Sequence, residues 1–317
     1  MSGIVTLTLS PCIDKTTTAP ALLPGTKLRC STPDFEPGGT GLNVARALKQ
    51  LGTDPLAIYP AGGYAGQFLQ ELLVSESIRT SAVPSRSQTR ENLIVQDCFT
   101  QQTYRFDMPA STLLPDEWQA CLDRLNMQAD VKYIVAAGDL PEGVPDDFYA
   151  KVANIANHKG ARLILEATGN ALRLALDEGV YLLKTSLHEL ARYTGTEDLP
   201  QQQTYELARE IILQRKASAI VAEPGAEGAM LVRENEFFHA VAPSVEAKST
   251  LGAGACLLAG IVSALSNGTS INQAVQYGIA CGSASTLCTS TKLCRMEDVE
   301  KLAPDVKRDM LISVTSL

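Results

Sequence analysis

Short apolar runs alternate with segments of helical periodicity along most of this chain. The runs are rich in aliphatic and β-branched residues, which is typical of buried parallel strands, and they occupy residues 4–9, 56–59, 133–137, 162–165, 180–184 and 219–222. Helical periodicity is found at residues 42–51, 67–75, 146–158, 204–214 and 255–265. This alternation predicts an α/β fold with a mostly parallel sheet that is covered by helices on both faces.

Two stretches, residues 14–35 and 88–108, break this alternation, because they carry Thr-rich or alternating strand patterns and no helical period. We expect them to form one small β-sheet that acts as a lid. It would be inserted in two pieces into a single domain spanning residues 1–317. A small sheet leaves edges and one face unprotected. We therefore predict a homodimer that forms through the lid sheet.

Composition narrows the function classes. Of the 317 residues, 45% are hydrophobic and 20% are charged, and the formal net charge of −8 argues against a nucleic-acid partner. The eight cysteines contain no CxxC pair, and the first residues, MSGIVTLTLS, lack the features of a signal peptide. No uncharged apolar run reaches membrane-spanning length. We expect a cytoplasmic protein that engages neither a membrane nor nucleic acid.

Two glycine-rich turns stand out, and each is followed by a helical pattern. The first reads PGGTGLNVARAL at residues 37–48, and the second reads GAGA at residues 252–255 before an apolar helix. Glycines let a ligand approach the backbone, and free amides at a helix N-terminus bind anions. Either turn by itself is as typical of tight packing as of a ligand site, so their combination decides the interpretation.

With LTLSPCID at residues 7–14 and GAEGA at residues 225–229, the two turns resemble the ribokinase-like carbohydrate kinases, and among them the phosphofructokinase B branch. The segments GTKLRCSTPDFEPGG, LNVARAL, TRENL and QTYRFDMP resemble the 6-phosphofructokinases of that branch, with tagatose-6-phosphate kinases and 1-phosphofructokinases as near relatives. The resemblance covers nearly the whole chain. It implies a ribokinase-like fold and phosphorylation of a sugar phosphate by ATP, with Mg²⁺ as cofactor.

The resemblance implies a sugar-binding role for four residues near the first turn. Asp14 and Asn43 would hydrogen-bond sugar hydroxyls, since a carboxylate accepts and an amide both donates and accepts. Gly38 and Gly39 would let the sugar lie against the backbone.

The resemblance also implies that basic residues of the predicted lid bind the phosphate that the sugar already carries. Arg90 would clamp it, because a guanidinium matches the geometry of phosphate. Lys27 and Arg29 would add positive charge, within one chain or across a dimer. On the same side Asp139, in Gly-Asp-Leu-Pro, stands where the family has a serine and adds a negative charge.

The second turn departs from the family at the reacting centre. The resemblance implies that the amides of Gly252, Ala253 and Gly254 stabilise developing charge, and it places the general base at position 255, where the family has aspartate. Ala255 cannot accept a proton. General-base catalysis contributes about 10²–10⁴-fold to a rate, so we expect weak activity.

The nucleotide side departs from the family as well. The positions that the resemblance implies there are Lys184, Ser186, Glu223, Gly225 and Gly228, with Glu189 holding magnesium through water. Ser186 replaces the asparagine of the family's Asn-x-x-Glu motif, and Glu223 replaces a serine or threonine. A carboxylate at position 223 that faces a phosphate charge 4 Å away would repel it by roughly 4 kcal/mol at an effective dielectric of 20.

Three functions remain open at this point. The first is a slow ATP-dependent kinase that converts fructose 6-phosphate or tagatose 6-phosphate to the bisphosphate, with water or the phosphate itself taking the proton. The second is a catalytically inactive sugar-phosphate-binding or regulatory pseudokinase. The third is a subunit that acts as the partner of an active paralogue through the lid sheet.

Overall fold

The computed structural model describes residues 3–196, 200–223, 225, 227–288 and 292–309. Ten strands of this part of the chain form the main sheet. They are β1 (Ile4–Leu7), β4 (Leu56–Ala61), β5 (Arg79–Pro84), β8 (Tyr133–Ala137), β9 (Arg162–Glu166), β10 (Val180–Ser186), β11 (Ala217–Glu223), β12 (Gly228–Arg233), β13 (Glu236–Val241) and β14 (Lys307–Asp309). Their spatial order is β14-β13-β12-β11-β10-β9-β8-β1-β4-β5. Pairing is parallel from β11 to β5 and antiparallel from β11 to β14, so the predicted mostly parallel sheet is confirmed.

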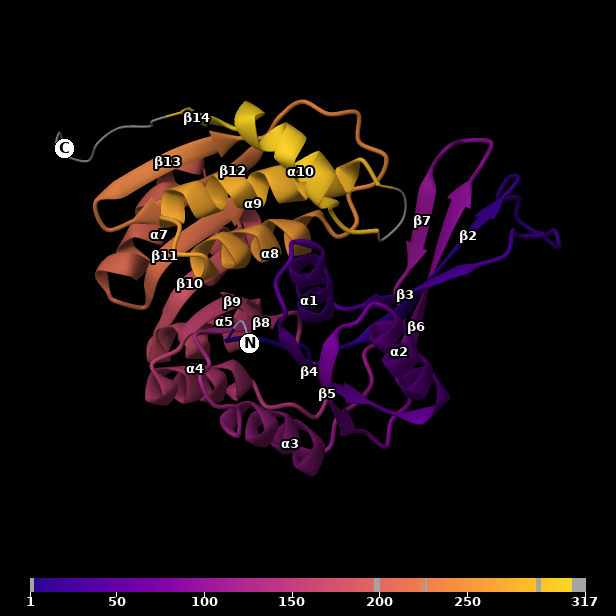
Figure 1. The fold of residues 1–317 in the computed structure, drawn as a ribbon, viewed down its shortest axis with the longest axis horizontal. Coiled ribbons are helices and arrows are strands. Elements are labelled where there is room, and N and C mark those ends of the chain that lie inside the picture. The colour runs from indigo at the N-terminus through magenta and orange to yellow at the C-terminus, as the bar shows by residue number, and fades with distance from the viewer. Residues whose placement is uncertain (1–2, 197–199, 224, 226, 289–291, 310–317) are drawn as a thin grey trace.

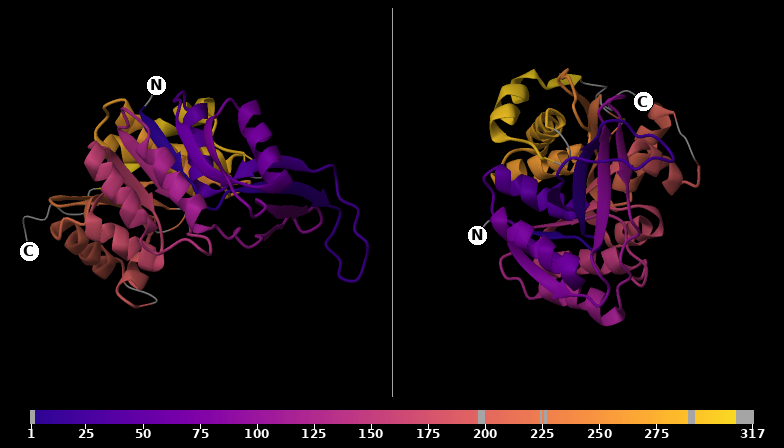
Figure 2. Two further views of the ribbon diagram at one scale, coloured as in Figure 1. Left: turned by 90° about the horizontal axis from the view of Figure 1, so that it is seen from below. Right: turned by 90° about the vertical axis from the view of Figure 1, so that its right-hand side faces the viewer.

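Helices cover both faces of this sheet, as predicted (Figures 1 and 2). They are α1 (Thr40–Gln50), α2 (Gly63–Ser75), α3 (Pro115–Asn126), α4 (Phe148–Lys159), α5 (Gly169–Glu178), α6 (Leu187–Tyr193), α7 (Gln201–Leu213), α8 (Ala253–Ser266), α9 (Ile271–Thr286) and α10 (Met296–Leu302), followed by a 3-10 turn at Ala303–Asp305. One buried cluster packs α1, α8, α9 and α10 on the sheet, and another packs α3 to α7 on its opposite face. Among the described residues, no helix is long and apolar enough to cross a membrane.

The second glycine-rich turn belongs to a helix and does not merely precede one. The periodicity predicts a helix from residue 255, but α8 begins at Ala253. Gly252 caps it with a left-handed φ of 84°, a conformation that glycine adopts readily. The GAGA turn therefore presents amides of a helix N-terminus, of which that of Ala253 donates to the backbone oxygen of Thr250 at 3.3 Å.

Four further strands form a second sheet, called the small sheet below, which projects from one side of the body (Figure 1). They are β2 (Cys12–Ala19), β3 (Asp34–Gly38), β6 (Arg90–Asp97) and β7 (Thr103–Phe106), in the spatial order β3-β2-β6-β7. Parallel pairing of β2 with β6 sets Cys12 opposite Arg90. The loop between β2 and β3 extends away from the body (Figure 2). That the small sheet acts as a lid stays a prediction.

Candidate functional site

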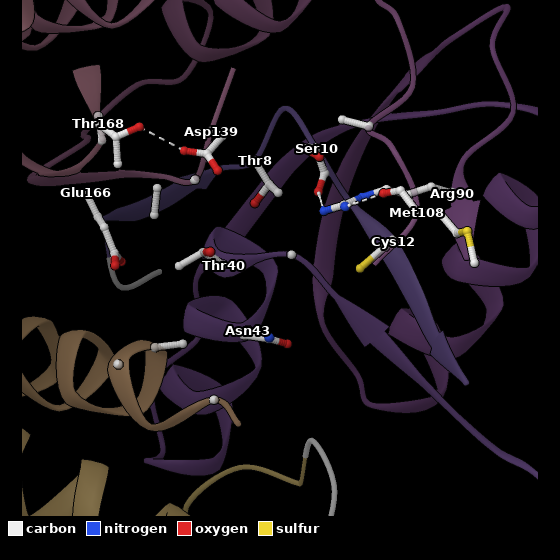
Figure 3. Close-up of a pocket in the computed structure, with 18 of the residues that line it drawn as sticks. Thr8, Ser10, Cys12, Thr40, Asn43, Arg90, Met108, Asp139, Glu166 and Thr168 are labelled. Carbon is white, nitrogen blue, oxygen red and sulfur yellow. Dashed lines mark hydrogen bonds between the residues drawn. The ribbon is translucent and has the colours of Figure 1, made fainter. Parts of the chain in front are cut away.

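A cavity of about 660 Å³, the first cavity, opens where the carboxyl ends of the parallel strands meet the small sheet (Figure 3). Ligands of open α/β sheets bind at this edge, and the size is typical of a small-molecule site. The lining residues are Thr8, Ser10, Cys12, Gly39, Thr40, Asn43, Arg90, Arg105, Met108, Pro109, Ala110, Ala137, Gly138, Asp139, Glu166, Ala167, Thr168, Gly252, Gly254 and Ala255. The two glycine-rich turns therefore lie on walls of one cavity.

Two guanidinium groups of the small sheet reach this cavity. Arg90 donates to the backbone oxygen of Met108 at 2.9 Å, and its buried Nε has no hydrogen-bond partner among the described residues. Arg105 pairs with Asp107 at 2.6 Å, and its Nη2 lies 3.7 Å from Oδ1 of Asp14. Guanidinium groups bind phosphate through charge-assisted hydrogen bonds. This wall of the cavity therefore suits a phosphorylated ligand.

Asp14 lies one layer behind the cavity wall and is only 1% exposed. Its Oδ1 accepts hydrogen bonds from Nδ2 of Asn92 at 2.9 Å and from Sγ of Cys12 at 3.5 Å. A side chain at position 38 would come within 2.7 Å of the other carboxylate oxygen, so Gly38 is the residue that leaves room for Asp14. Burial and the neighbouring Asp14 charge both raise the pKa of the Cys12 thiol. The role of Asp14 toward sugar hydroxyls stays a prediction.

The first glycine-rich turn places Gly39 and Asn43 on the cavity wall. Arg46, one turn further along α1, holds this turn in position. It donates to the backbone oxygen of Pro37 at 2.7 Å and to Oδ1 of Asn43 at 3.2 Å. Arg46 is 3% exposed and also pairs with Glu76. Arg46 donates to the amide oxygen of Asn43, so the amide NH₂ group of Asn43 remains to donate to a ligand.

The GAGA turn forms another wall of the first cavity. Gly252, Gly254 and Ala255 line it, and the free amides of this turn suit an anion. Ala255 contributes a methyl group and is 5% exposed. Cys256 is fully buried, and its sulfur accepts a hydrogen bond from the backbone nitrogen of Cys294 at 3.3 Å. The neighbouring thiol therefore does not supply the missing base.

A second cavity, of about 390 Å³, lies on the other side of the same turn. It is lined by Glu223, Gly225, Gly228, Ala242, Pro243, Ser244, Val245, Ala247, Thr250, Ala253, Leu257, Ile279, Gly282, Ser283 and Thr286. Its walls are mostly small and apolar, which suits the rings of a nucleoside. Among the described residues that line it, none is basic. The two cavities meet at the N-terminal turn of α8.

Lys184, on β10, connects the two cavities behind this turn. Its Nζ lies 2.7 Å from Oε1 of Glu166, which lines the first cavity, and 2.6 Å from Oε2 of Glu223, which lines the second. A side chain at position 254 would lie 3.0 Å from the same Nζ, so the lysine packs directly against Gly254. Burial lowers the pKa of Lys184, but the two carboxylates outweigh it and leave the pKa above its ordinary value.

This bridge gives Glu223 a partner that the sequence did not reveal. The sequence interpretation considered only the repulsion that its carboxylate would exert if it faced a phosphate. In the structure the carboxylate forms an ion pair with Lys184. A positive charge at this distance offsets most of the predicted repulsion. The same contact also engages Lys184, so this lysine is not free to bind phosphate.

The remaining predicted residues are distributed more widely. Ser186 accepts a hydrogen bond from the backbone nitrogen of Glu189 at 3.1 Å and so caps α6, and both residues lie outside the lining of the two cavities. Lys27 is exposed on the loop between β2 and β3 and is not brought to the first cavity within one chain. Asp139 does line that cavity, where it accepts a hydrogen bond from Thr168 at 3.0 Å.

Sequence reasoning missed Arg105 and Glu166. Arg105 lies in an alternating strand segment, where nothing in the pattern distinguishes a residue that faces the cavity from one that faces solvent. Glu166 is the last residue of β9. A carboxylate at the carboxyl end of a parallel strand is a signal that could have identified it, because ligands bind at that edge of the sheet.

Comparison with known proteins gives consistent matches. The pfkB family carbohydrate kinase model matches residues 7–298. The chain is 36% identical over 299 residues to the ATP-dependent 6-phosphofructokinase isozyme 2 of Mycobacterium tuberculosis H37Rv, covering 94% of this chain and 88% of that protein. It is also 36% identical over 303 residues to the isozyme 2 of Escherichia coli K12, covering 95% and 98%. The crystal structure of the Escherichia coli phosphofructokinase-2 with fructose-6-phosphate superposes with a TM-score of 0.88 at 34% identity, covering 96% of this chain and 98% of that chain.

Proposed function

Since this chain belongs to the pfkB family of carbohydrate kinases, we propose that it transfers a phosphoryl group from ATP to a phosphorylated ketohexose. Fructose 6-phosphate is the first candidate substrate and tagatose 6-phosphate the second, and each would give the bisphosphate. The observation that carries this proposal is the meeting of two cavities at the N-terminal turn of α8. One cavity has two arginines suited to a phosphate, and the other has small, apolar walls.

The geometry supports an in-line transfer. The phosphate of the sugar would bind Arg90 and Arg105, and its hydroxyls would lie against Gly39 and Asn43. The reacting hydroxyl would then face the GAGA turn, with the terminal phosphate of ATP beyond it. Amides fixed at a helix N-terminus stabilise the charge that spreads over the transferring group.

Magnesium would be held chiefly by the phosphates of ATP. Mg²⁺ in such sites takes one or two carboxylates together with substrate oxygens and water. Within the described residues, no group of three or more His, Cys, Asp or Glu side chains is placed to hold a metal ion. Glu189, which pairs with Arg192 at 3.3 Å, offers a carboxylate of the right chemistry and would reach the ion through water. When bound, Mg²⁺ would supply positive charge that offsets the charge of the phosphates.

The activity we propose is slow, because Ala255 contributes only a methyl group where the family has its base. Loss of a general base lowers the rate of a reaction by about 10²–10⁴-fold. Phosphoryl transfer depends mainly on positioning and electrostatic stabilisation, and the amides of the turn that provide them are retained.

The alternative is a catalytically inactive sugar-phosphate-binding or regulatory protein. Two observations favour it. Ala255 cannot accept a proton, and the ammonium of Lys184 is already paired with the carboxylates of Glu166 and Glu223. Arg90, Arg105 and Asn43 line the first cavity, so sugar-phosphate binding would survive the loss of turnover.

The test is ADP release by the purified protein at high enzyme concentration, with MgATP and fructose 6-phosphate. Tagatose 6-phosphate and fructose 1-phosphate run in parallel. Release that depends on the sugar phosphate supports the kinase. If none of the three sugar phosphates causes ADP release but calorimetry shows that one of them binds, the result supports a catalytically inactive sugar-phosphate-binding protein.

We also propose that two copies pair through the small sheet, in the cytoplasm, where thiols stay reduced. Tyr104 and Phe106 on the edge strand β7 are 39% and 47% exposed. Exposed apolar side chains on a sheet edge favour association. Phe106→Asp is expected to lower the sedimentation coefficient from that of a dimer to that of a monomer. Val74→Asp, on the exposed surface of α2, serves as the control.

A further inference from the structure

We propose that Glu166 replaces the absent base and accepts the proton of the attacking sugar hydroxyl. This inference rests on the proposed kinase function and adds a catalytic residue to it. Position 255, where the family carries its base, holds a methyl group in this chain. A carboxylate from a different strand lies in the same cavity.

The position of Glu166 is the first argument. It ends β9 and lines the first cavity together with Gly254 and Ala255. Figure 3 shows its side chain extending from the end of β9 toward the N-terminal turn of α8. The carboxylate therefore faces the place where a hydroxyl must lie to attack a phosphate held by that turn.

Contacts fix this position. Oε1 of Glu166 lies 2.7 Å from Nζ of Lys184, and the same Nζ would be 3.0 Å from a side chain at position 254. One ammonium group therefore separates the carboxylate from the backbone of the turn. Because Lys184 is itself buried and also paired with Glu223, it holds the Glu166 carboxylate beside the turn.

The second carboxylate oxygen of Glu166 is not used by Lys184, which lies beside Oε1. Oε2 of Glu166 is buried and has no hydrogen-bond partner among the described residues. Leaving a buried acceptor unsatisfied costs about 1–3 kcal/mol, so a donor that reaches it is bound favourably. The side chain as a whole is 26% exposed, and the terminal torsion of glutamate is broad. Rotation about that torsion turns an oxygen into the cavity, where a sugar hydroxyl is the donor.

The other candidate acceptors are less well placed. Asp139 shares the first cavity, but its side chain is exposed and accepts a hydrogen bond from Thr168. Glu223 lines the second cavity. Asp14 is buried behind the wall and already accepts two hydrogen bonds.

The step balances without a further reactant. The hydroxyl oxygen forms a bond to the γ-phosphorus of ATP while the bond from that phosphorus to the β,γ-bridging oxygen breaks. The electron pair of the broken bond stays on the bridging oxygen of ADP. The hydroxyl proton passes to Glu166, which later releases it to water.

Two variants test this assignment, Glu166→Gln and the double variant Glu166→Gln with Ala255→Asp. Glutamine keeps the shape of the side chain and an oxygen that accepts from Lys184, so the fold is retained, but it cannot take a proton. We expect turnover with MgATP and the best sugar phosphate to fall by about 10²-fold or more. Calorimetric affinities for both ligands should change by less than about threefold, and Glu178→Gln, on the exposed end of α5, should behave as wild type.

The double variant distinguishes a role of Glu166 as the proton acceptor from a role in holding Lys184 in position. An aspartate at position 255 supplies a base at the family position, so it should restore turnover to within about tenfold of wild type, since a general base supplies about 10²–10⁴-fold. A structural role for Glu166 predicts no rescue.

Three outcomes overturn the proposal. They are full turnover by Glu166→Gln, a loss that Ala255→Asp does not rescue while both ligands still bind, and a wild type that binds both ligands without turnover. The last result leaves sugar-phosphate binding intact. A wild type that binds neither sugar phosphate nor MgATP refutes the proposed function as well, so the two failures are distinguishable.

Discussion

The two cavities that meet at the start of α8 are built in opposite ways. The first is lined by charged and polar groups from separate elements, and its arginines are held by carbonyl and carboxylate oxygens. The second has mostly small, apolar walls, and none of its described lining residues is basic. Charged groups in fixed positions specify orientation, whereas apolar walls provide contact area. We infer that specificity resides in the first cavity and that nucleotide affinity is modest.

The bridge through Lys184 leaves the second cavity without a free positive charge, since none of its described lining residues is basic. Its ammonium is charged but paired with two carboxylates, one from each cavity. A triphosphate in the second cavity would be met chiefly by magnesium and by the amides of the GAGA turn. Changes to side chains that line one cavity and do not contact Lys184 should therefore act on that cavity alone.

The largest effect is expected for Arg90→Ala, which removes a guanidinium from the first cavity. Truncating one partner of a buried charge pair costs about 2–5 kcal/mol, so sugar-phosphate affinity should fall by about 10²-fold, measured by calorimetry. MgATP affinity should stay unchanged. Arg86→Ala, which removes an exposed arginine paired with Asp116, is the matched control. Equal losses for both ligands would show that the two cavities are not independent.

A smaller change in the opposite direction is expected for Glu223→Thr. It removes the carboxylate from the second cavity and frees Lys184 on that side. We expect MgATP to bind about tenfold more tightly, equivalent to about 1.4 kcal/mol, with sugar-phosphate affinity unchanged. Glu227→Gln, at an exposed carboxylate nearby, should have little effect because solvent screens it. Weaker MgATP binding by Glu223→Thr would mean that Glu223 serves the nucleotide.

Ala255→Asp by itself should change turnover little, by less than about tenfold, against the 10²–10⁴-fold that a needed base supplies. Glu223 still places a carboxylate in the lining of the second cavity, and Glu166 already offers an acceptor. Steady-state ADP release over a range of both substrates gives the measurement. If this single substitution raised kcat to the typical enzyme value of about 10 s⁻¹, the loss of kinase activity would not be distributed over several positions.

The smallest effect concerns thiol chemistry. Of the eight cysteines, only Cys30 and Cys98 are exposed, and both belong to the small-sheet region. Burial raises the pKa of Cys121 to about 12, and burial with the Asp14 charge also raises that of Cys12. Because the thiolate is the reactive form, Ellman's reagent at pH 8 should modify the two exposed thiols rapidly and the others only on unfolding. Rapid modification of a third thiol, mapped by mass spectrometry, would show that one cavity opens to solvent.

The sequence by itself determined the class of fold and part of its elements. The apolar runs at residues 133–137 and 162–165 correspond to β8 and β9, because strands buried on both faces must be apolar throughout. The glycines of both turns were also visible, since a tight turn before a helix leaves a local pattern. Missed elements such as β5, with its half-polar pattern, lack that signal.

Only the tertiary structure decided which charges meet. Glu166, Lys184 and Glu223 end or nearly end β9, β10 and β11, which are neighbours in the sheet, and Ser186 stands opposite Glu223 in the pairing of β10 with β11. Local periodicity specifies neither strand order nor register, so it gave no sign that Lys184 pairs with both carboxylates. The order and register of the strands decide which charged side chains meet. In this chain they place Glu166 in the cavity that Ala255 lines, and so decide whether a proton acceptor is present there.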